Sequence, residues 1–332
     1  MTVRVFHPPL ALLIVLSGCS SAQSVLDAQG EAAVALKNLI IFIALVAAAI
    51  WLAVVSVMAI TLVRSKDQTP RLDHRSERMM TIAVATATAA TILTVGILTL
   101  ASFYTTRALT SGGDPDVTII VRAQQWWWQF IYTGRDQKQL FQTANELHIP
   151  VGKTIRLRLQ AADVIHSFWV PSLAGKLDLI PGRENLLTLR AEKPGIYRGQ
   201  CAEFCGLQHS HMAFVVIAED DADYQRWLAG QRLDAATPSA AEAIAGQAVF
   251  LAKQCAACHA IRGTPAAGST GPDLTHVGSR RTIAAGLLET TRGSLAAWIA
   301  DPQTLKPGNN MPIVPLTADE LRQLSAYMGS LR

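Results

Sequence analysis

The sequence contains 332 residues, which is long enough for two or three structural modules. Half of the residues are hydrophobic and only 16% are charged, which indicates that part of the chain lies in a membrane. The formal net charge of +4 is small and gives no support for a nucleic-acid-binding surface.

Residues 1–18 have the pattern of a secretory signal peptide, with Arg4 before the short apolar run PPLALLIVL. The ending LSGC resembles the lipobox of bacterial lipoproteins, and this resemblance implies cleavage before Cys19 and a lipid on its thiol. Ordinary cleavage nearby and an uncleaved anchor remain alternatives, although nine apolar residues are too few to span a bilayer. Residues 19–37 would then form an extracytoplasmic N-terminal segment.

Residues 38–106 are predicted to form a transmembrane hairpin. Its two arms, residues 38–63 and 79–106, carry no charged side chain, and each exceeds the roughly 20 residues that cross the hydrocarbon core. Residues 64–78 between them contain several basic side chains, and short basic loops stay in the cytoplasm. The hairpin therefore predicts that both termini and everything after the second arm lie outside the cytoplasm.

Residues 115–230 form the next predicted domain, which is rich in short β-type segments. Seven such segments are separated by Gly, Pro and Asp, and the segments TIRLRLQ and NLLTLRA alternate between apolar and polar residues as half-buried strands do. This pattern predicts an antiparallel Greek-key barrel or sandwich. Residues 220–230 at its end are predicted to form a short helix.

The segment CAEFCGLQHSHM contains a dense group of candidate metal ligands. Two thiols, two imidazoles and a thioether occur within twelve residues, and a further imidazole, His166, lies upstream. Thiolate, thioether and imidazole suit copper, and two cysteines four residues apart could bridge two copper ions. A disulfide between Cys201 and Cys205 and a structural zinc site are the other interpretations.

The wider strings HSFWVPSLAGKLDLIPG and GQCAEFCGLQHSHM resemble the dinuclear copper (CuA) domain of cytochrome c oxidase subunit 2. The resemblance implies a cupredoxin-like barrel. It also implies that the copper ligands are His166, Cys201, Glu203 through its carbonyl, Cys205, His209 and Met212. The Glu203 side chain matches a family position that helps to hold magnesium against the catalytic subunit.

Three consecutive tryptophans, Trp126 to Trp128, occur near the start of this domain. On a strand, Trp126 and Trp128 would share one face, and packing in the core is the default role for such side chains. The family has a Gln-Trp-x-Trp pattern in this position, and its first tryptophan is the residue through which electrons enter. By this match, that residue is Trp126.

Residues 231–241 are poor in large apolar side chains and contain Pro238, so they are predicted to form a flexible linker. Residues 242–332 form the last predicted domain. Its motif Cys255-Ala-Ala-Cys258-His259 is the attachment signature of c-type haem, with two thioether bonds and a proximal histidine. A thiol redox motif or half of a zinc site would be the alternative.

The sixth haem ligand is expected to be distant in sequence. Met311 lies in the loop KPGNNMP and is the preferred candidate, while Met328 lies in a final amphipathic helix and His276 is a third candidate. The strings CAACH, GPDLTHVGSR, WIADPQTLKPG and NMP together resemble class I cytochrome c, which implies an all-α domain with His259 and Met311 as axial ligands.

The whole chain thus resembles a bacterial cytochrome c oxidase subunit 2 with a class I cytochrome c fused at its C-terminus. The implied fold is a multidomain membrane protein with a two-helix hairpin, an all-β barrel and an all-α haem domain. The implied function is an electron relay from a cytochrome c or a bc1-type complex, through haem c and CuA, to the catalytic subunit 1, with subunit 3 as a further partner. An exported copper-delivery or redox-sensing lipoprotein and a quinol-oxidase-type subunit are the alternatives.

Overall fold

The computed structural model describes residues 23–64, 74–110, 114–134 and 139–332. The predicted signal peptide and Cys19 lie outside these described residues, as does most of the predicted basic loop. Residues 34–112 form one compact unit, and the remaining parts of the chain form a second.

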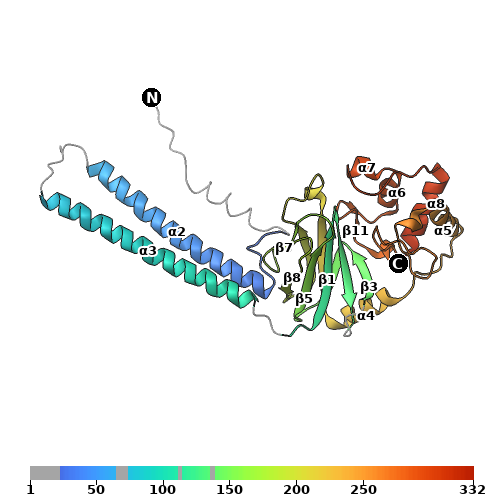
Figure 1. The fold of residues 1–332 in the computed structure, drawn as a ribbon, viewed down its shortest axis with the longest axis horizontal. Helices are drawn as coiled ribbons and strands as arrows, with labels where there is room; N and C mark the ends of the chain where they lie inside the picture. The colour runs from blue at the N-terminus through green and yellow to red at the C-terminus, as the bar shows by residue number, and fades with distance from the viewer. Residues whose placement is uncertain (1–22, 65–73, 111–113, 135–138) are drawn as a thin grey trace, which may run out of the picture. The chain divides into compact units, whose positions relative to one another are not determined.

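The first unit consists of two long helices, α2 (Glu31–Arg64) and α3 (His74–Thr110), which Figure 1 draws in blue and cyan. Both are long and apolar enough to cross a membrane. Helix α2 begins seven residues before the predicted arm, and the additional residues include the charged side chains of Glu31 and Lys37. Charged side chains near a helix end do not interrupt backbone hydrogen bonding, so a charge-free stretch marks only the apolar centre of such a helix.

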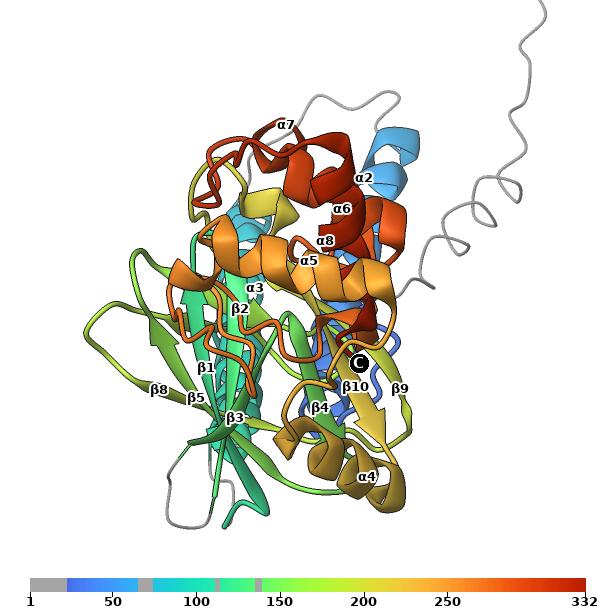
Figure 2. The same ribbon diagram turned by 90° about the vertical axis from the view of Figure 1, so that its right-hand side faces the viewer.

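The second unit begins with two five-stranded sheets, seen from two directions in Figures 1 and 2. The first sheet has the order β3 (Gln139–Ala144), β2 (Trp127–Thr133), β1 (Val117–Gln124), β5 (Ile155–Ala161) and β8 (Asn185–Leu189). The second has the order β4 (Glu146–Pro150), β10 (Ala213–Glu219), β9 (Gly195–Cys201), β6 (His166–Trp169) and β7 (Leu177–Leu179). Two parallel pairs, β1 with β5 and β10 with β4, show that the strands do not follow one another as a simple meander.

The core of this domain lies between the two sheets. Along β5, Ile155, Leu157 and Leu159 are fully buried while the residues between them are partly exposed, which is the alternation that the sequence predicted. Trp128 is also fully buried, and its ring centroid lies 5.0 Å from that of Phe214 on the opposite sheet. The predicted β domain is confirmed, but both sheets are mixed, so the expectation of purely antiparallel strands is wrong for the pairs β1–β5 and β10–β4.

The C-terminal part is helical and contains α5 (Ala241–Ala252), α6 (Arg292–Ala300), α7 (Pro302–Leu305) and α8 (Ala318–Ser330). Figure 2 shows these helices gathered at one end of the strands. Helix α8 begins with a capping box in which Thr317 and Glu320 satisfy each other's backbone amides. Two apolar helices, a β domain and a helical domain follow one another as predicted, so the fold class is confirmed.

The segment between the β domain and α5 differs from the flexible linker that we expected. Helix α4 (Asp221–Arg232) continues to Arg232, and the next residues are held by hydrogen bonds to the C-terminal domain. Ala235 N donates to the carbonyl of Arg262 at 3.1 Å, and Arg262 Nη2 donates to the carbonyl of Leu233 at 3.0 Å. A segment of small polar residues is flexible only if its backbone has no bonding partner. In this chain Arg262 bonds the backbone of Leu233 and Ala235, so the segment is held in place.

Candidate metal centres

The predicted copper ligands converge at one end of the β domain. His166 begins β6 and Cys201 ends β9, and these strands pair in the register Phe168 to Cys201, which brings the upstream imidazole beside the second segment. The turn after Cys201 leads through the short helix η2 (His209–His211) to Met212, directly before β10. Strand pairing thus brings together residues 35 or more positions apart.

Cys201 lies beside three other ligand atoms. Its Sγ atom is 3.7 Å from Cys205 Sγ, 3.9 Å from His166 Nδ1 and 3.2 Å from the carbonyl oxygen of Glu203. A disulfide requires a sulfur–sulfur distance of about 2.05 Å, so the two thiols are not linked. The disulfide interpretation does not describe this arrangement.

Cys205 is the centre of a second, similar group. Its Sγ atom lies 3.6 Å from His209 Nδ1 and 3.8 Å from Met212 Sδ. Each thiol therefore has one imidazole of its own and one weaker ligand atom. A single tetrahedral zinc ion needs all four strong donors around one point, whereas two half-sites joined by a pair of thiols suit two copper ions.

Electrostatics favour a thiolate in this pair. The neighbouring Cys205 thiol lowers the pKa of Cys201 to about 3, and His166 acts in the same direction. The pKa of Cys205 is raised because the sulfur of Cys201 lies next to it. Burial lowers the pKa of His166, but Cys201 and Asp163 outweigh burial and raise it overall. Cys201 is therefore the thiolate of the pair, and Cys205 keeps its proton. A soft cation that binds both sulfurs would displace that proton.

Asp163 is a supporting residue that the sequence analysis did not single out. Its Oδ1 atom lies 2.8 Å from His166 Nε2, which turns the Nδ1 atom of that ring toward Cys201. Gln125 is another, since its Nε2 atom donates to the carbonyl of Cys205 at 2.8 Å. Partners of this kind orient metal ligands. Asp163 lies three residues before the candidate ligand His166, and this spacing was the feature of the sequence that could have identified it.

The Glu203 carboxylate is partly exposed beside Lys176. It lies 3.7 Å from Lys176 Nζ, and 44% of its side chain is exposed. Its carbonyl and its carboxylate therefore face different surroundings, as the predicted division of roles between copper and magnesium requires.

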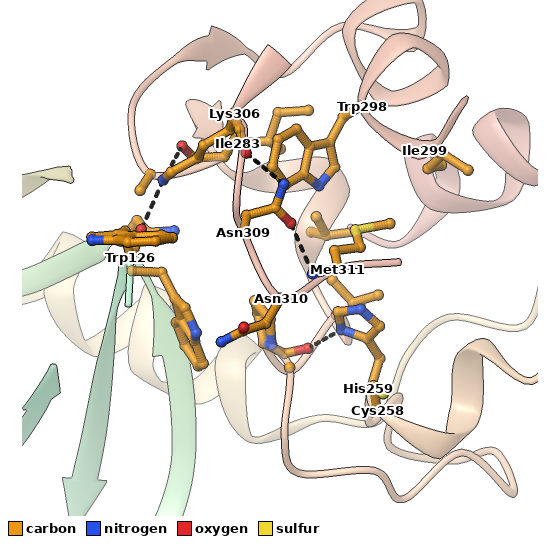
Figure 3. Close-up of a pocket in the computed structure, with 18 of the residues that line it drawn as sticks. Trp126, Cys258, His259, Ile283, Trp298, Ile299, Lys306, Asn309, Asn310 and Met311 are labelled. Atoms are coloured by element: carbon orange, nitrogen blue, oxygen red, sulfur yellow. Dashed lines mark hydrogen bonds between the residues drawn. The ribbon is translucent and has the colours of Figure 1, made fainter. Parts of the chain in front are cut away.

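A cavity of about 230 Å³ lies beside the haem attachment motif (Figure 3). Cys258, His259 and Met311 all line it, and Cys255 begins the adjoining short helix η3 (Cys255–Ala257). Much of the remaining lining is apolar, including Ile283, Leu295, Trp298, Ile299 and Met328. An apolar cavity bordered by thiol, imidazole and thioether fits a haem.

The ring of His259 is fixed in one orientation. Its Nδ1 atom lies 2.8 Å from the carbonyl oxygen of Pro272 and donates to it, which leaves Nε2 as the free ligand atom. Burial lowers the pKa of His259 and favours the neutral ring. A Cβ atom at Gly271 would lie 2.6 Å from the Cε1 atom of this ring, so only glycine allows the ring to lie there.

The two competing candidates for the sixth ligand differ in position. Met328 also lines the cavity, from α8. His276 contacts the carbonyl of Leu233 at 3.2 Å and Arg262 Nη2 at 3.3 Å instead. The structure therefore places Met311 and Met328, but not His276, at the cavity.

Trp126 lies between the two candidate centres. It occupies the turn before β2 rather than the strand, so the expectation that it shares a strand face with Trp128 is wrong. It is nevertheless buried, with 8% of the residue exposed, and its Nε1 atom donates to the carbonyl of Cys205 at 3.0 Å. It also borders the cavity, as Figure 3 shows.

Comparisons with known proteins agree with this geometry. Residues 134–219 match the family described as cytochrome c oxidase subunit II, periplasmic domain, and residues 243–332 match the cytochrome c family. Cytochrome c oxidase subunit 2 of Alkalihalophilus pseudofirmus is 35% identical over 341 residues, which cover all of this chain and 98% of that relative. The chain belongs to the cytochrome c oxidase subunit 2 family. The subunit 2 of Bacillus subtilis is 33% identical over 227 residues, 65% of this chain and 62% of the relative.

Among solved structures, the periplasmic domain of cytochrome oxidase subunit II from Bradyrhizobium japonicum is 31% identical and covers 36% of this chain and 96% of that chain, with a TM-score of 0.34. As a cytochrome c oxidase subunit 2 that carries a cytochrome c domain, the chain is part of a haem-copper terminal oxidase, an oxidoreductase complex. The subunit 2 domain implies copper, and the cytochrome c domain implies haem. Membership also implies a partnership with subunit 1 and a cytochrome c donor.

Proposed function

We propose that this subunit accepts electrons at its own haem c, passes them to a dinuclear copper centre, and delivers them to the catalytic subunit 1 for the reduction of oxygen to water. The observation that carries the proposal is the pair of half-sites around Cys201 and Cys205, near a cavity that is lined by Cys258 and His259 of the haem attachment motif. An external cytochrome c or a bc1-type complex would be the donor.

The copper centre would be held by His166, Cys201, the Glu203 carbonyl, Cys205, His209 and Met212. When bound, paired copper supplies one-electron redox chemistry at a site whose ligands hardly move. The protein contributes that rigidity, because Asp163 fixes His166 and Gln125 fixes the Cys205 carbonyl.

The haem would be attached through Cys255 and Cys258, with His259 and Met311 as axial ligands. Histidine–methionine ligation raises the haem potential. Asn309 supports the loop that carries the thioether, since its Oδ1 atom accepts from the Met311 amide at 2.8 Å. Trp126 would be the residue through which electrons enter the copper domain, because it borders the cavity and is bonded to the Cys205 carbonyl.

The remaining parts of the proposal concern the assembled oxidase. The exposed Glu203 carboxylate would hold magnesium together with subunit 1, since magnesium prefers oxygen ligands. The hairpin α2–α3 would cross the cell membrane with both termini and both metal domains on the extracytoplasmic side, and subunit 3 would complete the complex. The predicted lipid on Cys19 would add a second anchor at the same surface.

The test is the metal content of the purified chain. We expect two coppers and one covalent haem per chain, with a mixed-valence electron-spin spectrum in the oxidised chain that full reduction abolishes. Substitution of His209 by Asn removes one imidazole and should lower the copper count. Substitution of the exposed His211 by Asn, two residues away in the same turn, is the matched control and should leave both coppers in place. One copper per chain, or zinc in preference to copper, would favour a copper-delivery role.

A further inference from the structure

Lys306, which follows α7, joins the two metal domains through a single buried side chain. Only 3% of the residue is exposed. Its Nζ atom donates to the carbonyl oxygens of Trp126 at 2.7 Å, His211 at 2.8 Å and Ala284 at 3.2 Å, and Figure 3 shows the bond to Trp126. Trp126 and His211 belong to the copper domain and Ala284 belongs to the haem domain.

A buried ammonium group is unfavourable unless its hydrogens are all bonded. Three N–H donors and three carbonyl acceptors match in number here, so the charge is compensated by backbone dipoles rather than by a carboxylate among the described residues. Burial lowers the pKa of Lys306 to about 7, and the nearby Cys205 sulfur acts against this effect.

The contact around Lys306 has further backbone and side-chain bonds. The Ala213 amide, one residue after Met212, donates to the carbonyl of Ala285 at 3.0 Å. On the other side, Gln208 Nε2 donates to the carbonyl of Pro307 at 2.8 Å. The bonded atoms on the copper side lie in the segment that carries the candidate ligands, so movement of the haem domain would disturb that segment directly.

The haem-domain surface is shaped for this contact. Residues 284–286 all have positive φ angles, of 54°, 61° and 83°, although two of the three are alanines. Such a backbone is uncommon outside glycine and persists where its surroundings hold it. A Cβ atom at Gly286 would lie 3.0 Å from the Cβ of Ala213, so the turn approaches the copper segment as closely as glycine allows.

We propose that Lys306 is the positioning residue that seats the haem domain on the copper segment and on Trp126. The electron-transfer part of this inference rests on the proposed function, whereas the seating itself does not. Because Trp126 is covered in the seated arrangement, an external donor reduces the haem of this chain and does not reach Trp126 directly. Haem-to-copper transfer is then a step at fixed separation, not a search by a tethered domain.

The first test uses the unaltered full chain. Brief acylation with an amine-reactive acetate ester, read by peptide mass spectrometry, compares Lys306 with Lys153, whose side chain is 50% exposed. We expect Lys306 to react at least about tenfold more slowly, because it reacts only after the domains separate. Equal labelling of the two lysines overturns the proposal.

The second test uses Lys306→Met, which keeps the side-chain length and leaves three buried carbonyls without their donor. Loss of a buried charged partner of this kind weakens an interface about 30-fold or more. We expect faster hydrogen exchange at the Ala213 amide, and a slow, viscosity-dependent phase in haem-to-copper transfer after photoreduction. The haem and copper spectra should match those of the unaltered chain. Lys153→Met is the matched control and should change none of these quantities.

These readouts separate the two proposals. If the copper count fails but Lys306 remains unreactive and the Ala213 amide remains protected, the seating stands and the relay does not. If both metals are present and Lys306→Met transfers electrons in one unchanged fast phase with the Ala213 amide equally protected, Lys306 has no positioning role. If Lys306→Met does not fold, the labelling of the unaltered chain decides the matter alone.

Discussion

Substitution of Gly246 by Ala should destabilise the haem domain, although alanine is the better helix former. Gly246 lies in the middle of α5, where it crosses α8. An added Cβ atom would lie 2.1 Å from the carbonyl oxygen of Gln323, 2.6 Å from the carbonyl carbon and 2.8 Å from Tyr327 Cβ. Two of these three atoms are backbone, so no side-chain rotation relieves the clash.

The magnitude follows from two opposing effects. Alanine gains about 1 kcal/mol over glycine in a helix interior. Overpacking typically costs about 1–3 kcal/mol and occasionally more, and here α8 must move by roughly 1 Å to restore ordinary contact. The large displacement of a rigid helix places the cost at the upper end, so we expect a net loss of about 2 kcal/mol. For a domain of this size, that corresponds to a fall in Tm of about 8 °C or more.

The assay is thermal unfolding of the haem-loaded full chain, followed through the haem absorbance band. Because α8 also carries Met328 at the haem cavity, the band should shift before unfolding as well. Gly230→Ala is the matched control, since a Cβ atom at this helical position in α4 meets nothing within 4 Å. It should stabilise its own region by up to about 1 kcal/mol, which hydrogen exchange of the α4 amides can report. A Gly246→Ala chain that unfolds at or above the temperature of the unaltered chain would refute the argument.

Three further outcomes are expected. Met212→Leu should retain two coppers but raise their reduction potential, because a weak thioether donor stabilises the oxidised state and affects the potential more than the copper affinity. Electrochemistry checks this shift, and loss of copper would contradict the prediction. Glu203→Gln should leave the copper spectrum unchanged and lower magnesium or manganese occupancy in the assembled oxidase. Burial raises the pKa of Glu146, which accepts from the Arg281 amide; its stabilising effect is therefore present below the ordinary glutamate pKa and is lost as pH rises through the raised one. Denaturation of Glu146→Gln between about pH 4 and 8 should show a stability advantage over the unaltered chain that grows with pH.

The candidate ligands were accessible from sequence because most of them lie close together. Five of the six proposed copper ligands lie between Cys201 and Met212, so a short loop is enough to gather them. His166 lies far upstream, and its position depends on the pairing of β6 with β9. Only the family resemblance connected it with the loop, since alternation of apolar residues does not show which strands pair.

Supporting residues were harder to predict because their roles depend on neighbours brought together by the fold. Asp163 is an ordinary loop carboxylate until the pairing of β6 turns His166 toward Cys201. Trp126 was expected on a strand, yet it lies in a turn, where it packs with the core of the β domain and donates to the Cys205 carbonyl. The expected role in core packing is confirmed, and only the shared strand face with Trp128 is wrong.

Lys306 shows most clearly why the arrangement of the two metal domains was not predicted. Lysine is rarely buried, and nothing in KPGNNMP distinguishes this one from a solvated loop side chain. Its partners are backbone carbonyls, which every residue possesses, so no pattern of side chains in the copper domain announces them. The composition of residues 231–241 instead suggested a flexible tether. The contacts that replace the tether are made largely by main-chain atoms and by buried side chains such as Lys306 and Gln208, so ions in the solvent screen them little. Salt should therefore have little effect on haem-to-copper transfer in this chain, whether or not the linker is cut, provided that Lys306 remains in place.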